Sequence, residues 1–135
     1  KKIEYINDSK ATNLFATSFA LSSFKSIFWI LGGRSKEEKL DYLYPYLNRV
    51  EYVFTIGESG EMFADQLKGK VEVNFVGSLE NAFYSAVKVI QKRGLNKSVL
   101  LFSPACSSFD QFKDFEERGD RFREIVLKYL GNIDA

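Results

Sequence analysis

The chain has 135 residues, of which 45% are hydrophobic and 16% aromatic, so it can bury the core of one globular domain and is neither disordered nor fibrous. Nineteen Lys and Arg against eighteen Asp and Glu leave a formal charge of +1 without a basic run, which argues against a nucleic-acid partner. One Cys and no His exclude an internal disulfide and a Cys–His zinc site, and indicate a reducing, cytoplasmic setting.

The apolar stretches of the chain are short. The longest, residues 27–31, falls far below the ~20 residues that a membrane-spanning helix needs, and the first residues show no signal-peptide pattern. We therefore expect neither a membrane anchor nor a membrane partner. Because the sequence starts at Lys1 without Met and enters an apolar run almost at once, we also expect an excised domain or a processed fragment.

Five short runs rich in β-branched and aromatic residues predict strands. Four of them end directly before glycine or a Ser-Pro pair, which indicates buried strands that stop at sharp turns. The first run leads into Asn7-Asp8 and alternates less clearly. In chain order the five runs are residues 3–6, 27–31, 52–56, 71–76 and 99–102.

Helical patterns fill the gaps between these runs. The clearest begins after Ser78, a suitable N-cap, keeps its apolar residues on one face, and stops at Gly94. Less regular patterns predict helices over residues 13–24 and 60–67. The last helix is expected to end before Gly131 and to bury a face made of Phe122, Ile125, Val126, Tyr129 and Leu130.

A further helix is predicted between the second and third strands. Ser35-Lys-Glu-Glu38 fits a capping box at its start. Pro45 should kink or break this helix. Its buried face would be formed by Leu40, Leu43 and Leu47.

Strands that alternate with helices at this spacing predict right-handed βαβ crossovers and a mostly parallel sheet of five to six strands with helices on both faces. The expected fold is a single Rossmann-like, three-layer α/β domain over residues 1–135. Ligands of such sheets bind outside the carboxyl ends of the strands. Polar segments follow those ends, so a site is expected among residues 7–10, 32–36, 57–60 and 103–108.

None of the glycine-rich segments fits a nucleotide-binding loop. Residues 32–36 lack the G-x-x-x-x-G-K-[ST] spacing that lets successive backbone amides cradle phosphates. Residues 57–60 keep only a fragment of G-x-G-x-x-G, and Glu58 would repel a pyrophosphate there. Glycines that allow tight turns after strands explain both segments better.

The densest polar loop, residues 7–13, places a carboxylate, a cation, two hydroxyls and two amides between a strand and a helix. One or two of these side chains suit helix caps, but hardly all of them, so a ligand role is as well supported as a structural one. Lys36 has two interpretations: a charge that receives an anion, or an exposed lysine in the first turn of a helix.

Residues 103–108 combine a lone thiol with two adjacent serines. Without a His as base, Cys106 is better explained as a small buried side chain than as a nucleophile. Ser107 and Ser108 lack that partner too, and their hydroxyls suit hydrogen bonds to a carboxylate or a helix cap. The charge pattern of residues 116–124 predicts a solvated helix face, in which Gly119 indicates a break or a close backbone approach.

Two segments together resemble a known family. Asn7-Asp-Ser-Lys-Ala-Thr-Asn13 and residues 103–122, in this order and at this separation, are similar to the C-terminal domain of the Mur ligases, in the branch that adds D-glutamate. Gly32-Gly33 with Lys36 fits a third element, and the resemblance covers essentially the whole chain. The family's N-terminal uridine-nucleotide-binding domain and its central ATPase domain are expected to be absent from this chain, which has no P-loop motif.

The resemblance implies a reaction that uses ATP and Mg²⁺. The carboxylate of UDP-N-acetylmuramoyl-L-alanine would be phosphorylated, and the amine of D-glutamate would attack the acyl phosphate to form an amide. Asp8 would reach the ribose of ATP, and Lys10 would lie near the phosphates and the amino acid. No Mg²⁺ ligand is assigned here, because those of the family lie in its central domain.

Position by position, the resemblance also implies a binding site for D-glutamate. Lys36 and Thr12 would hold its side-chain carboxylate, while Ser108 and the backbone of Phe115 would hold its α-carboxylate. Two anchors on separate strand ends suit a dicarboxylate, since charge-assisted hydrogen bonds at both ends of the molecule would aim its amine.

Two alternatives remain open: a sister Mur ligase that adds another amino acid, and a non-catalytic α/β module that binds an anion or a protein. The Asp-Asn-Pro-Arg signature of the diaminopimelate- and lysine-adding relatives is absent, which favours D-glutamate. The complete motif over residues 7–13 favours a ligase over a binding module. The resemblance implies a cytoplasmic enzyme of peptidoglycan synthesis, whose C-terminal domain alone would neither hydrolyse ATP nor form an amide.

Overall fold

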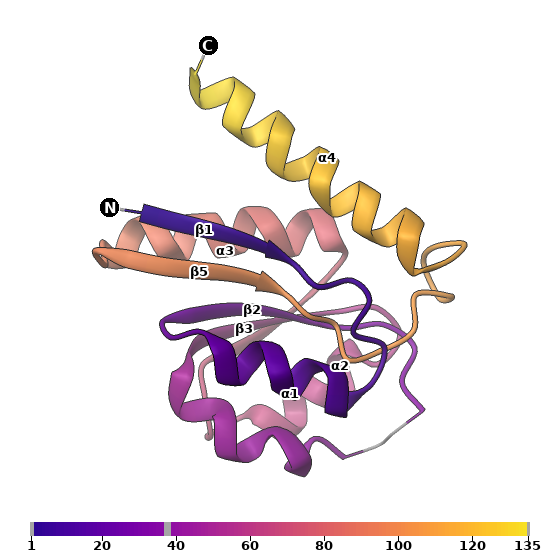
Figure 1. Ribbon diagram of the computed structural model, residues 1–135. Helices are drawn as coiled ribbons and strands as arrows, with labels where there is room; N and C mark the ends of the chain where they lie inside the picture. Colours follow the sequence, from indigo (N-terminus) through magenta and orange to yellow (C-terminus); the bar gives the residue numbers. More distant parts are fainter. Residues whose placement is uncertain (1, 37–38, 135) are drawn as a thin grey trace.

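The computed structural model describes residues 2–36 and 39–134 (Figure 1). Within them, strands and helices alternate along the chain. In order, the elements are β1 (Lys2–Asn7), α1 (Leu14–Ser23), β2 (Ile27–Gly32), η1 (Asp41–Arg49), β3 (Val50–Ile56), α2 (Gly60–Leu67), β4 (Val73–Gly77), α3 (Leu79–Arg93), β5 (Lys97–Phe102) and α4 (Phe115–Asp134).

The five strands form one sheet in the order β1-β5-β2-β3-β4, and every neighbouring pair is parallel. The 3₁₀-helix η1 and the helices α1 and α2 lie on one side of this sheet, and α3 and α4 lie on the other (Figure 1). The predicted three-layer α/β architecture is therefore confirmed, with five strands.

The central strand β2 is buried on both faces, as the short apolar run predicted. Because side chains alternate along a strand, Trp29 and Leu31 enter the core cluster under α1 and α2, whereas Phe28 and Ile30 enter the cluster under α3 and α4. In the second cluster the ring of Phe83 contacts those of four neighbours, and removing such a ring costs about 3–5 kcal/mol of folding free energy. These neighbours are Tyr5, Tyr84, Phe122 and Tyr129.

The predicted caps of α3 are confirmed. The hydroxyl of Ser78 accepts a hydrogen bond from the N–H of Asn81, and Gly94 ends the helix in the left-handed conformation at φ 61°. The strand predicted at residues 71–76 is Val73–Gly77, and it is not buried, because it forms an edge of the sheet where Asn74 and Phe75 are exposed.

The helix predicted from Ser35 onward is wrong in its start and in its type. Ser35 and Lys36 are not helical, Glu37 and Glu38 of the proposed capping box lie outside the described residues, and a 3₁₀-helix begins only at Asp41. Pro45 lies inside it, and because proline has no N–H, the i→i−4 bond that an α-helix needs at that position cannot form. Leu40 and Leu43 are buried, as predicted.

The predicted end of the last helix is also wrong, because α4 continues through Gly131 to Asp134. Gly131 does not adopt the positive φ of a glycine C-cap, and nothing lies within 4 Å of the position where a Cβ would stand. Phe122, Ile125 and Val126 are buried as predicted, but Leu130 is exposed.

Candidate functional site

Strand β5 lies where the connections of the sheet change sides. The segments that follow its neighbours β1 and β2, namely α1 and η1, pack on one face of the sheet, while α4, which follows β5, packs on the other. Loops that diverge from adjacent parallel strands leave a crevice at their carboxyl ends, where ligands of open α/β sheets bind. The carboxyl edge around β5 is thus the candidate site, as the sequence predicted.

Side-chain hydrogen bonds join the loops after β1 and β5. The hydroxyl of Ser103 donates to the Asp8 carboxylate at 2.7 Å and contacts the Thr17 hydroxyl at 2.9 Å. The Ser9 hydroxyl donates to the Phe115 carbonyl at 2.8 Å. Several residues of the dense polar loop therefore support the structure of the site.

The guanidinium of Arg118 fastens the same two loops from inside. Its side chain is only 1% exposed, and it donates from Nε to the Ser9 hydroxyl at 3.0 Å, from Nη2 to the Ser9 carbonyl at 2.6 Å and from Nη1 to the Cys106 carbonyl at 3.0 Å. Burial lowers the pKa of Arg118 to about 10, which still leaves it charged at neutral pH. A solvated side chain was predicted at this position, and that prediction is wrong.

Arg118 was hidden in the sequence by its charged neighbours. It stands four residues before Phe122 and seven before Ile125, so helical spacing puts it on the apolar face of α4. This helical spacing is the signal in the sequence that could have identified Arg118 as a buried residue. The partners that make its burial acceptable are carbonyl and hydroxyl groups of distant loops, and the sequence does not reveal them.

Gly119 shows the close backbone approach that was one of its two predicted roles. A Cβ at this position would stand 3.3 Å from the Cβ of Ser9, and the Gly119 carbonyl accepts a hydrogen bond from the Asn7 amide at 2.9 Å. The helix is not broken there. The loop after β1 therefore lies directly on the first turns of α4.

Thr12 and Lys36 meet in one pocket of about 390 Å³ at the carboxyl edge. We name it the three-loop pocket, because its residues come from the loops after β1, β2 and β5. Two of its side chains are cationic, although Arg34 is paired with Glu58, and none of the described residues that line it carries a carboxylate, so it favours an anion. The lining residues are Thr12, Asn13, Arg34, Lys36, Ser107 and Phe109.

Lys10 and Phe115 lie together in a second pocket of about 350 Å³, between the loop after β1 and the start of α4. The remaining residues of this pocket are Asn7, Ser9, Glu116, Gly119 and Asp120. The predicted site residues thus divide between two pockets, with Thr12 and Lys36 in one and Lys10 and Phe115 in the other.

Ser108, Asp8 and Cys106 line neither pocket. Ser108 is buried between Ser107 and Phe109, which both line the three-loop pocket. Asp8 is half-buried, and burial raises the pKa of its carboxyl group, an effect that the hydrogen bond from Ser103 partly offsets. Cys106 is completely buried, as expected for a packing side chain rather than a nucleophile.

The glycines after β2 allow the loops to approach each other. Gly33 has a φ of +140°, and a Cβ there would stand 2.5 Å from the carbonyl oxygen of Ser107 and 3.0 Å from the Cβ of Cys106. A side chain at this position would push the loops after β2 and β5 apart. Gly33 is therefore explained by the close approach of two loops, whereas the predicted tight strand-to-helix turn is found at residues 57–60, between β3 and α2.

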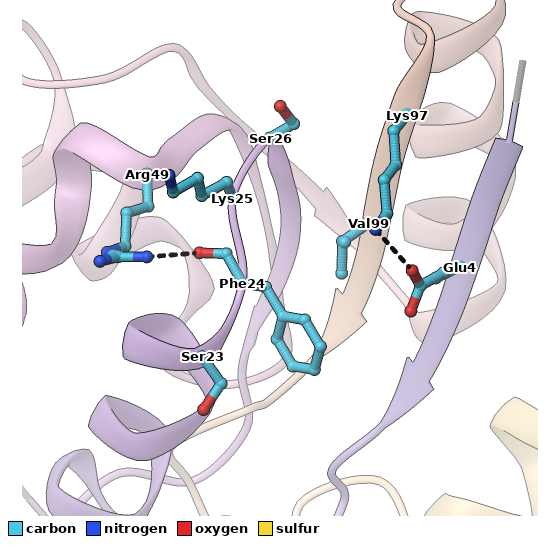
Figure 2. Close-up of a pocket in the computed structure, with 8 residues that line it drawn as sticks. All are labelled: Glu4, Ser23, Phe24, Lys25, Ser26, Arg49, Lys97 and Val99. Atoms are coloured by element: carbon cyan, nitrogen blue, oxygen red, sulfur yellow. Dashed lines mark hydrogen bonds and ion pairs between the residues drawn. The ribbon is translucent and has the colours of Figure 1, made fainter.

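Another pocket, of about 330 Å³, lies at the opposite, amino-terminal edge of the sheet (Figure 2). Its Arg49 donates to the carbonyl of Phe24 at 3.1 Å, and its Lys97 pairs with Glu4 at 3.4 Å. Two of its three cationic side chains, Arg49 and Lys97 but not Lys25, are therefore shown to be engaged by groups of the protein. Because it is remote from the diverging loops, we do not assign the site to this pocket.

Neither a metal cluster nor a membrane span is found in the described part of the chain. Within residues 2–36 and 39–134, no three His, Cys, Asp or Glu side chains gather to hold a metal ion. In the same residues, no helix has the length and apolar character to cross a bilayer. Fold and site together define a Rossmann-like α/β domain with a cationic, ligand-sized pocket at the carboxyl edge of its sheet.

Comparison with known proteins gives a closer relationship. No family model matches the chain. The chain is 48% identical to the UDP-N-acetylmuramoylalanine–D-glutamate ligase of Nitrobacter hamburgensis over 127 residues, which make up 94% of this chain and 27% of that protein. It is 43% identical to the ligase of the same name from Rhodospirillum rubrum over 124 residues (92% and 26%), and 42% identical to that of Phenylobacterium zucineum over 135 residues (99% and 29%).

The chain is therefore homologous to a segment of the UDP-N-acetylmuramoylalanine–D-glutamate ligases, consistent with the C-terminal domain of the Mur ligase family. It spans a little over a quarter of the length of these relatives. The resemblance based on residues 7–13 and 103–122 is confirmed.

Proposed function

We propose that the chain is the amino-acid-binding, lid-like domain of a larger ligase that adds D-glutamate to UDP-N-acetylmuramoyl-L-alanine with ATP. The observation that carries this proposal is the meeting of Thr12 and Lys36 in one cationic pocket of a chain homologous to D-glutamate ligases. The names of these relatives favour D-glutamate over the amino acids of sister ligases. The remaining domains bind the uridine nucleotide and most of ATP.

The side-chain carboxylate of D-glutamate enters the three-loop pocket. There the ammonium of Lys36 and the hydroxyl of Thr12, which both lie on the exposed surface of the pocket, donate hydrogen bonds to it. Each charge-assisted hydrogen bond to a carboxylate is worth about 1.5–3 kcal/mol. Lys36 thus provides the larger share of the affinity.

We assign the α-carboxylate to Ser108 and Phe115. Ser108 directly follows Ser107 of the three-loop pocket, and Phe115 is the first residue of α4 and lines the second pocket. Because the carbonyl of Phe115 already accepts the Ser9 hydroxyl, we assign its N–H to the substrate. The N–H groups of a first helical turn attract a carboxylate.

ATP lies against the loop after β1, where Lys10 approaches its phosphates and Asp8 its ribose. Lys10 is exposed in the second pocket, which supports this role, whereas Asp8 must share its carboxylate between the ribose and Ser103. We assign Mg²⁺ to the rest of the ligase, because the family resemblance implies that its ligands lie in the central domain.

In the reaction, the carboxylate of UDP-N-acetylmuramoyl-L-alanine accepts the γ-phosphoryl group of ATP and becomes an acyl phosphate. The free amine of D-glutamate attacks the acyl carbon, and a tetrahedral intermediate then expels phosphate to leave an amide. This domain binds D-glutamate at both carboxylates and closes over the nucleotide, which aims the amine and excludes water. We place the enzyme in the cytoplasm, in peptidoglycan synthesis.

The proposal is tested with the complete protein. Purified protein, ATP, Mg²⁺ and UDP-N-acetylmuramoyl-L-alanine are incubated with labelled D-glutamate, and the uridine-containing product is separated. We expect the label in that product, and little or none when labelled L-glutamate, D-lysine or diaminopimelate is supplied instead. A product formed equally well with diaminopimelate would assign the domain to a sister ligase, and no product with any amino acid would contradict the ligase assignment.

A further inference from the structure

The backbone of Arg34 is fixed at the mouth of the three-loop pocket. Its N–H donates to the Ser107 carbonyl at 3.0 Å, and the Ser107 N–H donates back to the Arg34 carbonyl at 3.0 Å. The Ser107 hydroxyl reaches the same carbonyl at 3.2 Å. Together they form an isolated antiparallel bridge between the loops after β2 and β5, so the Cα of Arg34 has a defined position relative to β5.

The guanidinium of Arg34 is oriented by one of its three nitrogens. Nε donates to Glu58 at 2.9 Å, and the N–H of Glu58 is in turn held by the Asp110 carboxylate at 2.9 Å. Within residues 2–36 and 39–134, no hydrogen bond or ion pair uses Nη1 or Nη2 of Arg34. The two terminal nitrogens form the fork that binds a carboxylate bidentately.

The ion pair with Glu58 has little value as a stabilising contact. Both side chains are more than half exposed, at 54% and 58%, and surface pairs of this kind contribute little to folding. The pair orients the guanidinium of Arg34. An arginine that is already held at Nε loses less side-chain entropy when it binds an anion. Glu58 itself does not line the pocket.

The pocket offers a second cation besides Lys36. Lys36 is a flexible point charge, which cannot provide the planar fork that matches both oxygens of a carboxylate. Arg34 stands two residues before it in the same loop, and both line the pocket. On the basis of the proposed function, we propose that the Nη atoms of Arg34 bind the side-chain carboxylate of D-glutamate beside Lys36 and set the preference for a charged over a neutral side chain.

Steady-state kinetics of the complete ligase test this role. Arg34→Ala should raise the KM for D-glutamate about tenfold or more while kcat and the KM for UDP-N-acetylmuramoyl-L-alanine stay within about twofold. The KM of Arg34→Lys for D-glutamate should lie between those of the wild type and Arg34→Ala, because lysine restores the charge but not the bidentate fork. Glu58→Gln, which keeps Arg34 but weakens its orientation, should raise the KM about two- to fivefold.

The ratio of kcat/KM for D-glutamate to that for D-glutamine distinguishes the loss of side-chain carboxylate binding from a general loss of enzyme activity. This ratio should fall about tenfold or more in Arg34→Ala, because only the carboxylate gains from the guanidinium. Arg93→Ala removes another paired arginine, near Glu51 and Glu72 and away from the pocket, and should leave the ratio unchanged. An unchanged KM and ratio in Arg34→Ala would overturn the inference alone, whereas a wild-type protein that adds no D-glutamate would overturn the proposed function.

Discussion

The guanidinium of Arg118, in the first turn of α4, donates to both the hydroxyl and the carbonyl of Ser9, which lies 109 residues earlier in the chain. A third bond, to the Cys106 carbonyl, brings in the loop after β5. Its carbon Cζ also lies 5.7 Å from the centre of the Phe102 ring. One buried side chain thus fixes the two loops on which Lys10, Thr12 and Ser108 stand.

Replacing Arg118 should destabilise the fold strongly. Arg118→Met leaves the Ser9 and Cys106 carbonyls buried without their donors, and we expect a loss of about 2–4 kcal/mol in the free energy of unfolding. The matched control is Arg121→Met in the same helix, whose exposed ion pair with Glu80 should contribute less than about 0.5 kcal/mol. Urea unfolding measures both, and equal losses in the two variants would contradict the structural role of Arg118.

The two glycines of α4 should respond in opposite ways to alanine. At Gly131 the space is open, so Gly131→Ala should stabilise the helix by about 0.5–1 kcal/mol. At Gly119 the new Cβ would stand 3.3 Å from the Cβ of Ser9, which Arg118 prevents from moving away. Gly119→Ala should therefore bring no gain and a net loss, visible as a lower melting temperature. A melting temperature of Gly119→Ala above that of the wild type would show that the loop after β1 can move away to accommodate the new Cβ.

The carboxyl group of Asp8 should make stability depend on pH. Burial raises its pKa in the folded state, so the protonated form is favoured there, and the contribution of this group to stability is lost as the pH rises through that raised value. Asp8→Asn keeps an acceptor for Ser103 without the charge. We expect the melting temperature of Asp8→Asn to exceed that of the wild type at pH 7, and the difference to shrink toward pH 4. A difference that grows as the pH falls would mean that the folded state favours the carboxylate.

The 135-residue chain should have no catalytic activity by itself. It contains no P-loop motif to cradle a triphosphate, and its described residues gather no metal-binding cluster. A phosphate-release assay with ATP, D-glutamate and UDP-N-acetylmuramoyl-L-alanine should stay at background. Turnover by this chain would contradict its assignment as one domain of a larger ligase.

The sequence predicted the layers and the edge of the sheet that carries the pockets, because both depend on local signals. The spacing of apolar residues distinguishes strands from helices, and the turn-forming residues after each strand mark the carboxyl edge of the sheet. Gly119 was recognised for the same reason, since a glycine inside a helical pattern needs an explanation from outside the helix.

Features that depend on distant contacts were missed or misjudged. The burial of Arg118 requires acceptors from two other loops, so a charge pattern read along α4 could not show it. The exposure of β4 follows from its place at the sheet edge, which strand order decides. The division of the predicted site residues between two pockets likewise depends on how three loops meet.

The binding of D-glutamate by the three-loop pocket is tested most directly by the KM for D-glutamate in the Lys36→Ala variant of the complete ligase. Loss of one charge-assisted hydrogen bond, about 1.5–3 kcal/mol, should raise this KM roughly 10- to 100-fold and leave the KM for UDP-N-acetylmuramoyl-L-alanine near normal. Lys128→Ala, on the exposed side of α4, is the control and should change neither. Equal losses for both substrates, or no change for D-glutamate, would contradict the assignment of this pocket.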